Sequence, residues 1–279
     1  MKKDTLNQIL LQFVFMIFFS IPVSNVFSAS VDTVNIYSNA MQKNIKCVVI
    51  LPESYKNNRN HFPVVYLLHG YSGSYSNWIM KAPGLKSDVD AFQVIVVCPD
   101  GNYNSWYFDS PVDRSIKYET YISTEVPAYI DAAYHTIAKR NFRAITGLSM
   151  GGHGALSLGW KHADFFGAAG SMSGALDLSP WKNKYDLIRA LGDTLQNKNF
   201  INFSVVNLVK KIPAQIPRLI FDCGINDPFI EANRQLHNEL LESKIPHDYI
   251  ERNGVHNWDY WRNAVSYQLM FFHNYFRSN

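Results

Sequence analysis

The segment around Ser149 has the residue types and spacing of an activated nucleophile. Its sequence, Gly147-Leu148-Ser149-Met150-Gly151, is a G-x-S-x-G pattern that follows an apolar run and precedes a helical pattern. Because glycine has no Cβ, these two positions allow a tight turn that holds the serine hydroxyl exposed and under strain. The pattern predicts a nucleophile at Ser149; the alternative is an ordinary glycine-rich turn.

A serine hydroxyl is a poor nucleophile at neutral pH and needs a base, which a carboxylate then orients. Asp227 lies on the loop after a strand expected at 218–223, and His256 lies between a strand expected at 247–251 and the final helix. This order of nucleophile, acid and histidine is the one that a strand–turn–helix serine site requires. We therefore expect Ser149, Asp227 and His256 to form a triad.

The sequence offers alternative candidates for the acid and for the histidine of the triad. Asp222 is the alternative acid, but it lies within a strand, and Asp248 begins a strand at the end far from the site. His153 follows Ser149 but points along the next helix, and four further histidines fit solvent-facing helix positions: His135, His162, His237 and His273. No two histidines are four residues apart beside a carboxylate, so we expect neither a metal site nor a cofactor.

Two backbone N–H groups are candidates for an oxyanion hole. Met150 starts the helix after Ser149, where an N–H group has no partner within the helix. Tyr71 follows Gly70 on the loop after a strand expected at 62–68, and Gly70 permits close approach of the backbone. The alternative for this second loop is a simple strand-ending turn.

Aromatic residues are dense on the loop from 99 to 109, which should emerge at the same edge as Ser149. We expect Tyr103 and Trp106 from this loop, together with Trp258 beside His256, to bind flat acyl groups or sugar faces. The alternative is that these rings only pack the loop onto the sheet.

Short β-rich runs alternate with helical patterns, which is typical of an α/β fold with a mostly parallel sheet and helices on both faces. Val31–Tyr37 and Ile45–Leu51 fit an opening antiparallel pair, and six further runs give eight strands: 62–68, 94–98, 143–148, 168–172, 218–223 and 247–251. Helices are expected at 119–137, 150–161, 229–243 and 258–276. Pro127 is expected to kink or break the first.

The segment from Leu176 to Pro217 is less regular. It contains helical fragments at 181–191 and 203–211 and no clear strand. We expect it to form a cap or a wall over the cleft.

Composition limits the class of protein. The chain has 279 residues, of which 47% are hydrophobic, so one large core is possible and intrinsic disorder is excluded. Its net charge of +3 is too small to indicate a basic surface that binds nucleic acid. Its three cysteines cannot all pair, and Cys98 and Cys223 end strand-like runs, which favours small buried hydrophobes.

Residues 1–28 have the order of a secretory signal peptide. Lys2 and Lys3 precede an apolar run from Ile9 to Phe19, which is too short to span a bilayer, and small residues follow near Ser28. We expect cleavage near Ser28, a secreted or periplasmic protein with no stable membrane insertion, and one domain over 29–279.

Five motifs together resemble the esterase D-like "putative esterase" family of α/β-hydrolases, over nearly all of residues 31–276. They are Leu67-Leu68-His69-Gly70, Pro99-Asp100-Gly101, Gly147-Leu148-Ser149-Met150-Gly151-Gly152, Asp222-Cys223-Gly224 through Asp227, and Gly254-Val255-His256-Asn257-Trp258. The resemblance implies the α/β-hydrolase fold, with Ser149, Asp227 and His256 as the triad and the N–H groups of Tyr71 and Met150 as oxyanion donors.

Among the members of that family, an exported chain resembles most the carbohydrate esterases, which include feruloyl and acetyl xylan esterases. The expected function is therefore that of a serine esterase acting through an acyl-enzyme on acetylated or feruloylated plant-type oligosaccharides or on small esters. Two alternatives remain: an acyltransferase that passes the acyl group to a sugar or lipid hydroxyl, and a non-catalytic binding protein on a hydrolase scaffold.

Overall fold

The computed structural model describes residues 28–57, 60–192 and 198–279 and contains an eight-stranded sheet. The expected signal peptide, apart from Ser28, lies outside these residues. The strands, in the order β1-β2-β4-β3-β5-β6-β7-β8 across the sheet, are β1 Ser30–Ser38, β2 Lys43–Leu51, β3 Val64–Leu68, β4 Ile95–Pro99, β5 Arg143–Gly147, β6 Ala168–Met172, β7 Arg218–Gly224 and β8 His247–Arg252. β1 and β2 are antiparallel, β2 is antiparallel to β4, and all later neighbours are parallel. The mostly parallel eight-stranded sheet is confirmed.

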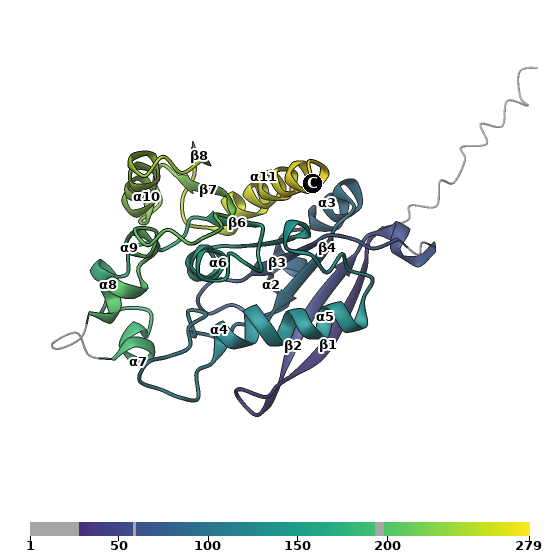
Figure 1. Cartoon of the computed structure of the whole chain (residues 1–279), viewed down its shortest axis with the longest axis horizontal. Coiled ribbons are helices and arrows are strands. Elements are labelled where there is room, and N and C mark those ends of the chain that lie inside the picture. The colour runs from purple at the N-terminus through teal and green to yellow at the C-terminus, as the bar shows by residue number, and fades with distance from the viewer. Residues whose placement is uncertain (1–27, 58–59, 193–197) are drawn as a thin grey trace, which may run out of the picture.

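Helices cover both faces of the sheet (Figure 1). They are α2 Asn77–Lys81, α3 Leu85–Phe92, α4 Tyr118–Thr120, α5 Val126–Ala133, α6 Met150–Lys161, α7 Leu187–Leu191, α8 Asn199–Phe203, α9 Val205–Leu208, α10 Ile230–Glu242 and α11 Trp258–Arg277. α2, α3 and α11 pack on one face, and α5, α6 and α10 pack on the other. Each face therefore has its own apolar core.

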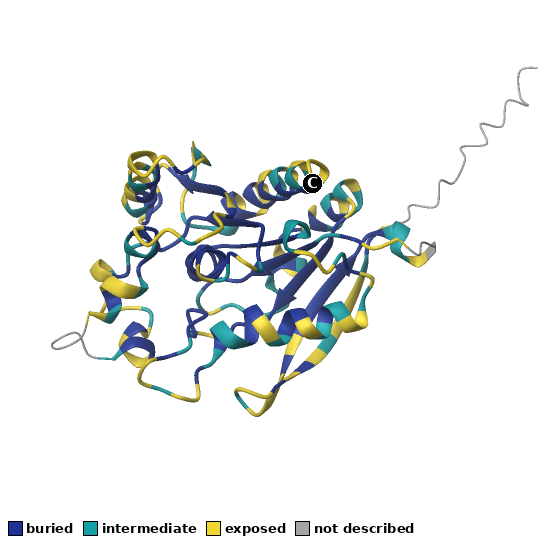
Figure 2. Ribbon diagram, viewed as in Figure 1, coloured by how far each residue is buried: buried dark blue, intermediate teal, exposed yellow. Residues whose placement is uncertain are grey.

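The central strands are buried on both sides, as Figure 2 shows in dark blue. β3, β4, β5 and β6 are buried along their whole length, which agrees with their mostly apolar or small residues; the exception is Arg143 at the start of β5, which pairs with Asp131. β1 alternates exposed and buried residues near its end, as expected of a strand at the sheet edge. The carboxyl ends of the parallel strands are consequently held rigidly, and the functional loops follow them.

The helix expected over residues 119–137 is helical as far as Ala133 and wrong only for residues 134–137. The chain forms α4, a π-helical turn at Tyr121–Glu125 and then α5, which ends at Ala133. Pro127, which has no N–H to donate, lies just after the π turn and starts α5 instead of breaking it. Beyond α5, the backbone at 135–137 pairs with Phe62 through two hydrogen bonds, so tertiary pairing overrides the helical pattern.

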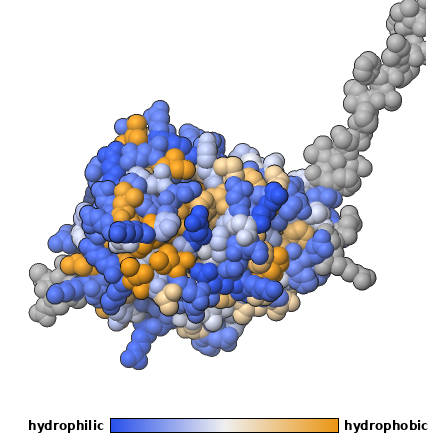
Figure 3. Space-filling view, turned by 45° about the horizontal axis from the view of Figure 1, so that its top comes forward, coloured by the Kyte–Doolittle hydropathy of each residue, from blue (hydrophilic) through white to orange (hydrophobic). Residues whose placement is uncertain are grey.

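The irregular segment contains less helix than its pattern indicates. The expected helix at 181–191 is a 3₁₀ turn, Ser179–Trp181, followed by the short α7, and the one at 203–211 is reduced to α9. Apolar side chains reach the surface on this side of the molecule, mostly in the left half of Figure 3, where α7–α10 lie in Figure 1. The exposed apolar residues there include Ile188, Ile201 and Leu241.

The three cysteines are free and buried, as the sequence predicts. Cys47 on β2 and Cys98 on β4 lie on neighbouring strands but belong to the cores on opposite faces of the sheet. Burial raises the pKa of both thiols. No helix of the described chain has both the length and the hydropathy that a bilayer crossing requires.

Candidate active site

Ser149 lies at the sharp turn between β5 and α6. Its backbone has φ 55° and ψ −118°, a conformation that is strained for any residue with a Cβ. The turn is held by the Ser149 N–H, which donates to the Met172 carbonyl, and by the Gly151 N–H, which donates to the Leu148 carbonyl. The strain therefore presents the side chain of Ser149 above the carboxyl edge of the sheet.

The structure brings together the three residues that the sequence singles out. Nε2 of His256 lies 2.9 Å from Oγ of Ser149, and Nδ1 of His256 lies 2.8 Å from Oδ2 of Asp227. Asp227 is 2% exposed, and its other oxygen accepts the backbone N–H of Phe229 at 2.9 Å. The result is a continuous hydrogen-bonded chain from a buried carboxylate to the serine hydroxyl.

The loops of the acid and the histidine are joined by their backbones. Ile225 N–H donates to the Arg252 carbonyl at 2.9 Å, and Asn226 N–H donates to the Gly254 carbonyl at 3.1 Å. A Cβ at Gly224 would come within 2.5 Å of that same Gly254 oxygen, so only glycine allows the two loops to approach this closely. This junction fixes the separation between Asp227 and His256.

The imidazole of His256 is held between two aromatic rings. Phe229 contacts it with ring centroids 4.9 Å apart at 77°, and Trp261 contacts it with centroids 4.8 Å apart at 88°. Both geometries are edge-to-face contacts, which orient a ring more strictly than simple apolar packing does. The two hydrogen bonds and the two ring contacts hold the imidazole in the same position, so His256 has one well-defined orientation.

The expected oxyanion donors both lie at the nucleophile. The N–H groups of Tyr71 and Met150 have no acceptor within the described part of the chain. A Cβ at Gly70 would come 2.6 Å from the Leu148 side chain and 3.4 Å from Cβ of Ser149, so the loop carrying Tyr71 packs directly against the serine turn. Two free N–H groups beside a serine hydroxyl are suited to stabilising an oxyanion.

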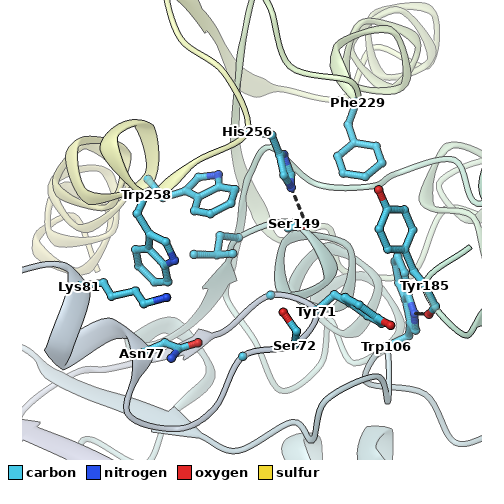
Figure 4. Close-up of a pocket in the computed structure, with 14 residues that line it drawn as sticks. Tyr71, Ser72, Asn77, Lys81, Trp106, Ser149, Tyr185, Phe229, His256 and Trp258 are labelled. Atoms are coloured by element: carbon cyan, nitrogen blue, oxygen red, sulfur yellow. Dashed lines mark hydrogen bonds between the residues drawn. The ribbon is translucent and has the colours of Figure 1, made fainter.

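Ser149 opens into a pocket of about 220 Å³ that has two arms. Figure 4 shows Trp258 and Lys81 on one side of Ser149, and Tyr71, Trp106 and Tyr185 on the other. Asn77 lies on the side of Lys81, and Ser72 lies between the arms. The pocket is therefore lined mainly by aromatic rings, with a few polar groups at defined places.

The three residues expected to bind substrate differ in position. Trp258 is half-buried and lines the pocket, and Trp106 is 2% exposed, lines the pocket and donates from its indole nitrogen to the Tyr185 carbonyl at 2.9 Å. Tyr103 is 52% exposed and is not a lining residue; its ring packs against Tyr71 with centroids 4.9 Å apart. Any effect of Tyr103 on substrate would act through Tyr71.

Sequence reasoning missed several lining residues, among them Asn77, Lys81, Tyr185, Phe229 and Trp261. Phe229 could have been found because it lies two residues after Asp227. Asn77 and Lys81 lie on the short helix α2, which has too few residues to give a periodic signal. Tyr185 belongs to the irregular segment, and its presence at the pocket agrees with the wall expected there.

Asp222, the alternative acid, serves a different network. It is fully buried, and its carboxylate accepts from Arg252 at 2.9 Å and from the Gln268 amide at 2.7 Å. Burial raises the pKa of this carboxyl, while the charge of Arg252 opposes the increase. His153 is likewise diverted: it is buried and its Nε2 lies 2.8 Å from the Phe203 carbonyl.

No cluster of three or more potential metal ligands occurs in the part of the chain that the structure describes. A family model described as "Putative esterase" matches residues 38–272. The chain belongs to this family. Its members share the α/β-hydrolase sheet described above, and the chain is a carboxylic ester hydrolase.

Three relatives show how the esterase relates to characterised proteins. It is 28% identical to an acetyl esterase of Caldicellulosiruptor saccharolyticus over 84% of this chain and 94% of that protein. It superposes on a ferulic acid esterase with a TM-score of 0.78 and 29% identity, covering 90% of this chain and 99% of the other. It is 27% identical to the diacylglycerol acyltransferase/mycolyltransferase Ag85A of Mycobacterium gordonae, over 83% of this chain and 76% of that protein.

Proposed function

We propose that this esterase hydrolyses its substrates through an acyl-enzyme formed on Ser149. The observation that carries the proposal is the hydrogen-bonded chain from Asp227 through His256 to Ser149, with distances of 2.8 and 2.9 Å. Such a chain activates an otherwise weak nucleophile.

The proton moves within this chain. Nδ1 of His256 donates to Asp227, which leaves Nε2 with the lone pair that takes the proton from Ser149 as its oxygen attacks the ester carbonyl. The N–H groups of Tyr71 and Met150 stabilise the oxyanion. His256 then returns the proton to the departing alcohol, and water repeats the sequence to release the acid and free Ser149.

The proposed substrates are acetylated or feruloylated plant-type oligosaccharides. The similarity to an acetyl esterase and to a ferulic acid esterase supports this class. The aromatic walls at Trp106, Tyr185 and Trp258 offer flat apolar surfaces that suit sugar faces and aromatic acyl groups. A pocket of about 220 Å³ fits a small acyl group with part of one sugar better than a long lipid chain.

We propose further that the protein is exported and cleaved after Ser28. Cleavage there would leave Ala29 as the first residue. Ala29 is 1% exposed, and its backbone nitrogen donates to Oδ2 of Asp90 at 2.8 Å. A new ammonium group at Ala29 would keep this contact and add charge to it, whereas cleavage after Ser30 would remove it. N-terminal sequencing of the exported protein tests the site.

Ser149→Ala is the decisive variant. We expect p-nitrophenyl acetate hydrolysis to fall by about 10⁴-fold or more, because no other group supplies the nucleophile. Ser87→Ala, at an exposed position on α3, is the matched control and should retain parental activity. Activity of the Ser149 variant at the parental rate would refute the assignment.

A fluorophosphonate probe provides an independent test. It should label the parent protein at Ser149 and leave Ser149→Ala unlabelled. Absence of labelling in the parent would favour a non-catalytic binding protein. Release of acid from a panel of acetylated and feruloylated xylo-oligosaccharides would then identify the acyl group.

Acyl transfer is the second candidate function, and the similarity to a mycolyltransferase favours it. In this reaction a sugar or lipid hydroxyl replaces water in the second half of the cycle. Product analysis in the presence of a competing alcohol separates the two functions. A transferred ester as the main product, in place of free acid, would establish acyl transfer.

A further inference from the structure

One arm of the pocket contains a cation without a counter-ion. Lys81, at the end of α2, lines the same pocket as Ser149 and is its only lysine, arginine, aspartate or glutamate. Its ammonium group lies 5.3 Å from the centroid of the Trp258 ring, and no carboxylate of the described chain pairs with it. We call the region around Lys81, Asn77, Trp258 and Trp261 the Lys81 arm.

The neighbours of Lys81 in this arm are hydrogen-bond donors. Oδ1 of Asn77 accepts the backbone N–H of Ser74 at 3.1 Å, which assigns the amide oxygen and leaves its NH₂ group without an acceptor in the described structure. Trp261 is 7% exposed, and its indole nitrogen is buried with no hydrogen-bond partner there. Buried donors are normally paired, so the Trp261 nitrogen indicates a missing acceptor, and the NH₂ group of the half-buried Asn77 is available to a ligand.

The opposite arm has the opposite character. There the carboxylate of Asp186 accepts from the Tyr71 hydroxyl at 2.9 Å and from the Asn104 amide at 3.0 Å. Both hydrogen bonds fall on Oδ2, and those from Asn104 and Tyr71 lower the pKa of this exposed carboxyl, so its charge is negative. Asp186 does not line the pocket, and the nearby Arg189 offsets part of its charge, so it disfavours an anion only weakly; the charged side chain that lines the pocket itself is Lys81, which attracts one.

We infer that the Lys81 arm binds a carboxylate carried by the ester substrate. Lys81 supplies the charge, the NH₂ group of Asn77 supplies a directed hydrogen bond, and the Trp258 ring supports the apolar part beside the carboxylate. The inference rests on the proposed esterase function and narrows its substrates to acidic esters. The carboxylate can belong to the acyl group, as in a half-ester of a dicarboxylic acid, or to a uronic acid on the alcohol side.

Two matched pairs of esters distinguish these sources. On the acyl side, mono-p-nitrophenyl succinate is compared with p-nitrophenyl butyrate, and on the alcohol side, a methyl O-acetylglucuronoside is compared with the corresponding glucoside. The measured quantity is the ratio of kcat/KM for the acidic ester to that for the neutral ester. In Lys81→Met, which preserves the length of the stem, this ratio should fall by about 5- to 30-fold for one pair.

Two further measurements sharpen the test. Lys81→Glu should lower the same ratio more than Lys81→Met, and raising the salt concentration should lower it in the parent protein but not in the two Lys81 variants. Lys139→Met is the matched control, because it removes the same charge from an exposed lysine near the start of β5, at the opposite end of the strand from Ser149. Its ratio should equal that of the parent.

The outcomes separate this inference from the proposed function. An unchanged ratio in Lys81→Met for both pairs, or an equal loss of activity on acidic and neutral esters, would overturn the carboxylate site while leaving the esterase intact. Failure of the parent protein to hydrolyse even the neutral esters would instead refute the proposed function.

Discussion

Nε2 of His69 accepts a hydrogen bond from the backbone N–H of Gly101, with 2.7 Å between the two nitrogens. The other ring nitrogen therefore carries the proton and donates to the Gly70 carbonyl at 2.8 Å. His69 is 1% exposed, and burial lowers its pKa, which favours this neutral form. Because the peptide between Gly70 and Tyr71 is planar and trans, fixing the carbonyl on one side turns the Tyr71 N–H to the other.

His69 is consequently expected to position the oxyanion donor. In His69→Ala the Gly70 carbonyl keeps only the hydrogen bond from the Gly73 N–H at 3.0 Å, and we expect kcat for p-nitrophenyl acetate to fall by about 10-fold, less than the loss of a whole donor. KM should change by less than about threefold, because ground-state contacts remain. If thermal stability falls while kcat stays at the parental value, His69 only stabilises the fold.

Asp227 and Asp222 should respond differently to the same substitution. Asp227→Asn removes the acceptor that holds the His256 tautomer, and we expect kcat to fall by about 10⁴-fold with the fold intact. Asp222→Asn leaves Arg252 short of its buried partner, so unfolding free energy should fall by about 3 kcal/mol while kcat stays within about tenfold. Steady-state kinetics and urea unfolding of both variants check this, and the reverse pattern would make Asp222 the acid.

Gly151→Ala should destabilise the protein. A Cβ at Gly151 would lie 2.5 Å from the His69 carbonyl oxygen and 2.7 Å from that of Leu68, both of which are backbone atoms that cannot rotate away. We expect a loss of about 1–3 kcal/mol in unfolding free energy, together with reduced activity, because the Ser149 turn must shift. Equal urea midpoints for variant and parent would show that the turn has more freedom than its contacts indicate.

Mild acid should weaken the fold through His153. Burial lowers its pKa to about 4, and its Nδ1 has no acceptor in the described structure for a second proton. In the unfolded chain its pKa is about 6.5, so below that pH the unfolded state binds a proton that the folded state does not. The contribution of His153 to the unfolding free energy is therefore complete above pH 6.5 and is lost as the pH falls toward 4. We expect about 2 kcal/mol less unfolding free energy at pH 5 than at pH 7 from this group.

His153→Gln keeps a donor for the Phe203 carbonyl and removes the titration. Its urea unfolding should therefore depend less on pH over the same range. If the parent and the variant lose equal free energy between pH 7 and pH 5, another group accounts for the acid sensitivity.

The fold and the candidate site could be predicted from the sequence where the local residue pattern and the strand topology indicate the same arrangement. The two glycines around Ser149 imply the turn, and parallel strands that end at one edge imply that loops carrying Asp227 and His256 converge there. The central strands β3 to β6 could be predicted from short runs with little alternation, because strands buried on both faces do not alternate. The roles of these residues still await the variants described above.

The sequence did not predict those features whose structure is determined by tertiary contacts. Residues 134–137 have a helical pattern, yet their backbone pairs with Phe62. The Lys81 arm depends on two helix ends far apart in sequence, α2 and α11, so no local pattern could reveal that Lys81 faces Trp258. Tyr185 reaches the pocket through a backbone with φ 55°, which propensity does not predict for a tyrosine.

The placement of Cys47 and Cys98 on opposite faces of the sheet bears on how the chain matures. Their sulfur atoms are separated by the sheet itself, so oxidation cannot link them without unfolding both cores. The folded protein therefore gains no covalent brace from an oxidising compartment and needs no reductant to keep its shape. The folded state is accordingly the same in a reducing and in an oxidising compartment.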